Sequence, residues 1–151
     1  MLMTMLLPAY VMSIFICGFC SILAQSSLRI IDSLATNLPP VQIFPALRNL
    51  IQQYFSSADP SHRRAALLAL GVSVEGCSEF MTPLMAQVWP MVEAGLNDSN
   101  PSVRKAACTA VSCLCEWLED ECASKHTTLV PVSFLALLSC RMLKILLCRL
   151  S

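Results

Sequence analysis

Residues 59–70 read DPSHRRAALLAL, and residues 100–111 read NPSVRKAACTAV. The second segment follows the first at an offset of 41 residues, and the same offset places Glu75 on Glu116. Over residues 60–90 this register gives eight identities in 31 positions without a gap. Two unrelated amphipathic helices would share hydrophobicity, but not proline, arginine and glutamate at one offset. The chain therefore contains an internal repeat.

Apolar residues recur at intervals of three and four around this repeat, which is typical of amphipathic helices. Breaks at Pro39-Pro40, at residues 57–60 and at residues 97–101 separate the periodic segments. Ser61 is expected to cap one helix, and Thr82 followed by Pro83 is expected to open another. The predicted helices are residues 26–38, 41–56, 61–77, 83–97 and 102–118.

A repeat of two antiparallel helices cannot bury its apolar face alone, so hairpins of this kind stack into a superhelix. The sequence therefore predicts an all-α fold, an α-solenoid fragment of the armadillo-type α-α superhelix class, with two full hairpins and flanking helices. The expected segments are an apolar leader at 1–25, a half repeat at 26–40, repeats at 41–78 and 79–122, and an apolar C-terminal helix at 123–151.

Composition and charge argue against several functions. The chain has 151 residues and a formal net charge of zero, so no overall positive charge favours nucleic-acid binding. The nine cysteines are an odd number, and most lie in apolar helical patterns, which favours buried reduced thiols over disulfides. Neither Cys17-x-x-Cys20 nor Cys113-x-Cys115 has a second pair to complete a zinc site. We expect no metal, no cofactor and no enzyme activity, because no catalytic motif or phosphate-binding glycine loop is present.

The two repeated segments resemble the HEAT repeat, in which Asp or Asn and Pro mark the turn and Arg opens the second helix. Residues 27–131 are similar to the middle repeats of importin-β-type karyopherins, especially the importin-four branch, through VEGCSEFM at 74–81 and PSVRKAA at 101–107. The resemblance implies nuclear import of basic cargo proteins such as ribosomal proteins and histones. It also implies contacts with the GTPase Ran and nucleoporins, and a location in cytoplasm and nucleus. Full-length members are much longer solenoids, so a truncated form is expected.

Two groups of residues are candidate sites. An acidic strip on the concave face, formed by the second helices of the hairpins, is expected to bind basic cargo; the alternative is a solvated helix end. This strip consists of Glu75, Glu79, Glu116, Glu119 and Asp120. A structural ladder of exposed pairs is expected between the turns, formed by Asp59 with Arg63 and by Asp98 with Arg104. Trp89 is expected in the core, whereas the role of Trp117 stays open.

Two other functions remain compatible with the sequence. The hairpins could serve as a generic HEAT scaffold in another assembly. Residues 1–24 carry no charge and are long enough to span a bilayer, so the chain could also be a small membrane-anchored protein. The acidic strip favours the transport receptor over the generic scaffold.

Overall fold

A computed structural model describes residues 21–125 and 127 of the chain. Within this part all regular structure is helical, so the predicted all-α class is confirmed. The elements in order are α2 (Ser21–Asn37), α3 (Pro40–Phe55), α4 (Pro60–Met81), the 3₁₀ turn η1 (Thr82–Leu84), α5 (Met85–Leu96), α6 (Pro101–Trp117) and α7 (Glu119–Ser124). The leader and the C-terminal helix predicted for 1–25 and 123–151 lie mostly outside the described residues.

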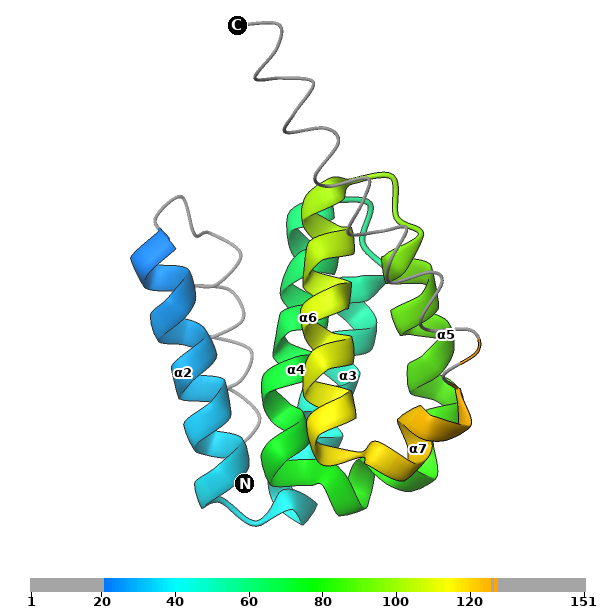
Figure 1. Ribbon diagram of the computed structural model, residues 1–151. Coiled ribbons are helices and arrows are strands. Elements are labelled where there is room, and N and C mark those ends of the chain that lie inside the picture. The colour runs from blue at the N-terminus through cyan, green and yellow to red at the C-terminus, as the bar shows by residue number, and fades with distance from the viewer. Residues whose placement is uncertain (1–20, 126, 128–151) are drawn as a thin grey trace, which may run out of the picture.

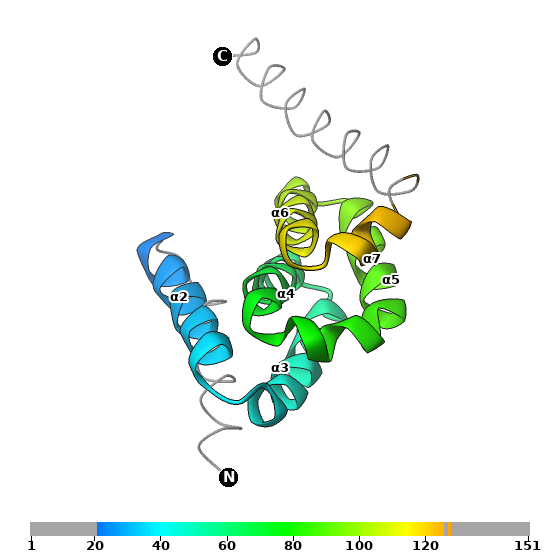
Figure 2. The same ribbon diagram turned by 60° about the horizontal axis from the view of Figure 1, so that its bottom comes forward.

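The helices form two layers that follow from the repeat. Helix α4 packs against α2 on one side and α6 on the other, and these three second helices form one layer (Figures 1 and 2). The first helices α3 and α5 form the other layer, where α3 packs on α4 and α5 packs mainly on α6. The hairpins α3–α4 and α5–α6 are therefore adjacent and stacked, as expected of a solenoid.

The second helices α4 and α6 begin with the same kind of cap, although it differs from the predicted one. The carboxylate of Asp59 accepts a hydrogen bond from the backbone N–H of Ser61 at 2.8 Å, and the Asn100 side chain does the same for Ser102 at 2.9 Å. Ser61 is therefore the donor at the second helical position and not the cap. Proline takes the first helical position in each helix, where a missing N–H costs nothing, so the capping side chain must stand one residue earlier.

The end of α4 also differs from the prediction. Cys77 has a non-helical backbone (φ −126°, ψ 16°), so the helix is kinked at its predicted end, but it continues to Met81. Thr82 does not cap α5, because its hydroxyl donates backward to the carbonyl of Ser78 at 3.0 Å. Residues Thr82–Leu84 form η1 instead, and α5 begins at Met85.

Small residues allow the second helices to approach each other closely. A Cβ at Gly76 would lie 2.1 Å from the carbonyl oxygen of Ala35 in α2, and one at Gly71 would lie 3.2 Å from the Cα of Ala110 in α6. Five residues correspond to about 140° around a helix, so the two glycines serve two different sides of α4. The repeated alanines are buried for the same reason: Ala65, Ala66, Ala69, Ala106, Ala107 and Ala110. Trp89 is 4% exposed, which confirms its expected place in the core.

Candidate functional site

The turns before α4 and α6 are joined by an ion pair that crosses from one hairpin to the next. Arg63 donates from Nε to Asp98 Oδ2 at 2.7 Å and from Nη2 to Oδ1 at 3.0 Å, while its Nη1 donates to the carbonyls of Ser57 and Ala58. The side chains of Arg63 and Asp98 are only 17% and 9% exposed. These hydrogen bonds from Arg63 are the main reason that the pKa of Asp98 lies below its ordinary value.

The pair of Arg63 with Asp98 is one rung of the expected ladder between neighbouring turns. It is mostly buried, however, and it does not follow the expected exposed pairs of Asp59 with Arg63 and Asp98 with Arg104. The Asp59 carboxylate caps α4 by accepting a hydrogen bond from the N–H of Ser61, and this bond lowers the pKa of Asp59 below its ordinary value. Arg104, the repeat counterpart of Arg63, donates from Nη1 to the carbonyls of Asp98 and Ser99 at 2.8 and 3.0 Å. Its Nε is buried and has no hydrogen-bond partner among the described residues.

The acidic strip is divided between three helices. Glu75 and Glu79 lie at the end of α4, Glu116 lies near the end of α6, and all three side chains are exposed. Glu119 and Asp120 begin α7, so they do not lie at the end of a second helix as the sequence suggested. Acids in the first turn of a helix interact favourably with its dipole, which gives these two residues a structural reason to be there.

Part of the strip lines a hollow. A depression of about 400 Å³ is lined by Thr82, Glu116, Trp117, Leu118, Glu119, Asp120 and Glu121. We call it the acidic hollow. Trp117 is 46% exposed there, so it is not a core residue. Glu75 and Glu79 do not line the hollow. The arrangement places four carboxylates around one accessible indole, which suits a cationic side chain.

A second hollow, of about 220 Å³, lies nearer the start of α4 and α6 and contains the two exposed cations Arg64 and Lys105. Arg64 precedes Glu75 by eleven residues, which is about three helical turns, so both lie on one side of α4. Lys105 and Glu116 have the same spacing on α6. The outer face of this layer is therefore basic at one end and acidic at the other. In the sequence, the 41-residue repeat already aligns Arg64 with Lys105, which indicates that the two cations occupy equivalent positions on neighbouring helices.

The cysteines only partly follow the expectation of buried thiols. Cys77 and Cys122 are buried, Cys108 and Cys113 are half-buried, and Cys115 is exposed, all of them reduced. Burial is the main cause that raises the pKa of Cys122 to about 12, and a hydrogen bond with Cys115 adds to the effect. Such a thiol stays protonated and unreactive near neutral pH.

One described stretch, Pro60–Leu96, is long and apolar enough to cross a membrane by length and composition. It comprises α4, η1 and α5, however, and 56% of its most apolar 18-residue segment is buried. Burial in the hairpin core explains its composition equally well. The proposed anchor at 1–24 lies outside the described residues, except that Ser21 to Ala24 begin α2.

Comparison with known proteins identifies the repeat. The model of the HEAT-like repeat family matches residues 60–114. The chain is 36% identical over 111 residues to the probable importin subunit beta-4 of Schizosaccharomyces pombe, which covers 74% of the chain. It is 29% identical over 107 residues to human importin-4 and 30% identical over 95 residues to transportin of Dictyostelium discoideum, covering 70% and 62% of the chain. The chain spans about a tenth of the length of each of these relatives.

The stacked hairpins and the matching repeat define the class: this is a segment of a HEAT-repeat α-solenoid. The extent of the matches to importins and transportin then gives the family. The chain belongs to the importin-β family of karyopherins.

Proposed function

We propose that this chain is a protein-binding segment of a nuclear import receptor. It binds basic segments of cargo proteins for transport between cytoplasm and nucleus. The observation that supports this most directly is the acidic hollow, where the carboxylates of Glu116, Glu119 and Asp120 surround the exposed Trp117. Carboxylates steer and orient a cationic partner, and the indole face can stack on a lysine or arginine side chain. Ribosomal proteins and histones are cargo classes with this chemistry. No part of the described surface is assigned to Ran or nucleoporins.

The test uses the full chain and a fluorescently labelled peptide rich in lysine and arginine. Reversing two charges of the hollow in Glu116→Lys/Asp120→Lys should weaken binding by about tenfold, or 1.4 kcal/mol, and should flatten its salt dependence. Fluorescence anisotropy at low and physiological salt measures both effects. Trp117→Ala should weaken binding while leaving the net charge unchanged.

A matched variant separates the hollow from general charge. Glu75→Lys/Glu79→Lys makes the same charge change on α4, outside the lining of the hollow. A loss equal to that of the first variant would assign binding to the whole acidic strip. Unchanged binding in Glu116→Lys/Asp120→Lys would show that the hollow is not the cargo site.

The second hollow, which contains Arg64 and Lys105, supports a second function, that of a generic HEAT scaffold. Arg64 and Lys105 lie on the same helices, α4 and α6, as Glu75 and Glu116, so this face also suits an acidic partner. An acidic peptide that bound through Arg64 and Lys105, together with no binding of basic peptides, would favour the scaffold over the cargo receptor.

A further inference from the structure

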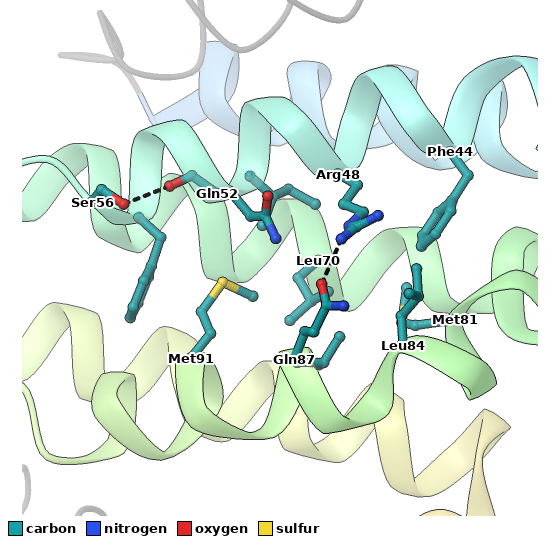
Figure 3. Close-up of a pocket in the computed structure, with 12 residues that line it drawn as sticks. Phe44, Arg48, Gln52, Ser56, Leu70, Met81, Leu84, Gln87 and Met91 are labelled. Atoms are coloured by element: carbon teal, nitrogen blue, oxygen red, sulfur yellow. Dashed lines mark hydrogen bonds between the residues drawn. The ribbon is translucent and has the colours of Figure 1, made fainter.

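Cysteines flank one hollow of the described surface and not the others. A groove between α3 and α5 has Leu70 of α4 in its floor, and Arg48 donates from α3 to the amide oxygen of Gln87 on α5 (Figure 3). No described cysteine lines this groove or the second hollow of Arg64 and Lys105. The acidic hollow differs, because cysteines stand at both ends of the segment that lines it.

The acidic hollow is lined almost entirely by the segment between Cys115 and Cys122. The six residues that separate these cysteines, 116–121, all line the hollow, and Thr82 is the one lining residue from elsewhere in the described chain. Cys115 lies in the last turn of α6, and Cys122 lies in α7. A bond between the two sulfur atoms would therefore close the lining of the hollow into a ring.

The fold brings the two thiols together across the bend at Leu118. The N–H of Leu118 donates to the carbonyl of Leu114 at 2.8 Å, and the N–H of Cys122 donates to the carbonyl of Leu118 at 3.1 Å. Both cysteines thus lie within about one helical turn of the bend, where α6 contacts α7. Their side chains are hydrogen-bonded to each other. Only a short approach of the two sulfur atoms separates this contact from a disulfide.

The two thiols differ in their access to solvent. Cys115 is exposed, whereas Cys122 is only 7% exposed, so a dissolved oxidant reaches Cys115 first. Burial keeps Cys122 protonated and protects it from dissolved reagents. Reaction with a sulfur atom that it already contacts is intramolecular, however, and proximity of this kind greatly accelerates a step. The exposed thiol therefore suits the role of the first to be oxidised, and the buried one suits the role of its partner.

We propose that Cys115 and Cys122 form an oxidative modification site, which hydrogen peroxide converts to a disulfide that fixes α7 against the end of α6. The Cys115 thiolate attacks one peroxide oxygen and breaks the O–O bond, and the departing hydroxide takes up the proton that the thiol released. The Cys122 sulfur then attacks the sulfur of the resulting sulfenic acid. The S–O bond breaks, and its hydroxide leaves with the Cys122 proton as a second water. The two thiols lose two electrons in total, and the peroxide gains them.

The disulfide acts on the geometry of the hollow. Helix α7 has six residues, so it is too short to be stable without its contacts to the rest of the chain. In the reduced chain α7 can open locally and carry Glu119 and Asp120 away from Trp117. The ring closed by the disulfide restricts this opening and holds the carboxylates around the indole. A thiol reductant reverses the bond, as is usual for disulfides that form in a reducing compartment.

The experiment treats the full chain with hydrogen peroxide at neutral pH and then blocks the remaining thiols with iodoacetamide. Trypsin and a glutamate-specific protease cut after Lys105, Glu116, Glu121 and Lys125, so the disulfide joins fragment 106–116 to fragment 122–125. Mass spectrometry should detect the joined fragments, and dithiothreitol should separate them. Hydrogen exchange of the α7 amides should be about tenfold slower in the oxidised chain, because loop closure restricts the opened state.

Matched variants identify the reacting thiols. Cys113→Ser should keep the joined fragments, because the Cys113 sulfur lies 3.5 Å from the position of a Cβ at Gly71 and thus faces α4. Cys115→Ser should abolish both the joined fragments and the slower exchange, with circular dichroism confirming that the helices are retained.

Several results would overturn the proposal. It is wrong if Cys113→Ser prevents the joined fragments while Cys115→Ser does not. It is also wrong if peroxide yields only a dimer linked through Cys115, if Cys115 is oxidised to sulfinic acid without the joined fragments, or if the disulfide leaves exchange in α7 unchanged. None of these measurements uses a cargo peptide, so their outcome is separate from that of the proposed cargo binding.

Discussion

The hairpins α3–α4 and α5–α6 share a turn, a cap and a row of alanines, but their second helices have different surroundings. Helix α4 is covered by α2, α3 and α6, whereas the described partners of α6 are α4, α5 and α7. Positions that match in the repeat consequently differ in burial: Val74 is fully buried and its counterpart Cys115 is exposed. Similar local sequence thus produces similar helices, while the neighbours determine what each position contributes to stability.

The largest expected effect of this difference is in the core. Leu67 of α4 is completely buried, and its repeat counterpart in α6 is the half-buried Cys108. Leu67→Ala should lower the free energy of unfolding by about 2–5 kcal/mol, through lost transfer energy and a residual cavity. Cys108→Ala should cost only about 1 kcal/mol, because a smaller group leaves a less buried site. Urea denaturation measures both, and equal losses would contradict the comparison.

The next effect concerns Gly76, whose repeat counterpart in the second hairpin is not a glycine. Gly76 lies against the backbone of Ala35, and its counterpart is the exposed Trp117. Gly76→Ala should destabilise the chain by about 1–3 kcal/mol, because the new methyl group must push α2 from α4. Trp117→Ala should change stability by no more than about 0.5 kcal/mol. Faster tryptic cleavage at the exposed Arg29 in Gly76→Ala would show that α2 is displaced; an unchanged cleavage rate would contradict the close contact.

A smaller effect is expected at the turns. Asp98→Ala removes the two carboxylate oxygens that accept from Arg63 and leaves its largely buried guanidinium with only the carbonyls of Ser57 and Ala58, so we expect a loss of about 1–3 kcal/mol. Asp59→Ala removes only an exposed cap and should destabilise the chain less. Thermal unfolding ranks the two, and a larger loss for Asp59→Ala would show that the pair between the turns is unimportant.

The smallest effect is the pH dependence of that pair. Because the pKa of Asp98 is lowered in the folded state, its stabilisation is complete above the ordinary aspartate pKa of about 3.9. It is lost as the pH falls through the lower folded-state value. Between pH 6 and pH 3, Asp98→Asn should therefore lose less stability than the parent chain. Parallel acid-unfolding curves would contradict this assignment.

The acidic strip shows where local sequence reasoning reached its limit. Its residues are exposed, as both interpretations of the sequence require, but the sequence pattern assigns all of them to two helices. In the structure the chain changes direction at Leu118, so Glu119 and Asp120 lie on α7. They line a hollow together with Glu116, whereas Glu75 and Glu79 do not line it. A change of direction between adjacent residues has little local signal. The same holds for the groove at Arg48, whose walls come from helices that are not consecutive in the chain.

The sequence by itself determined the helical class, the five main helices to within a few residues, and the stacking of two hairpins. It could do so because periodicity, proline-containing turns and a 41-residue repeat are local or translational patterns. Only the tertiary structure decided that Arg63 binds Asp98 instead of Asp59, that Trp117 is exposed, and that Arg48 faces a groove. These features depend on distances between helices far apart in the chain, and packing of buried surface sets such distances once all neighbours are in place.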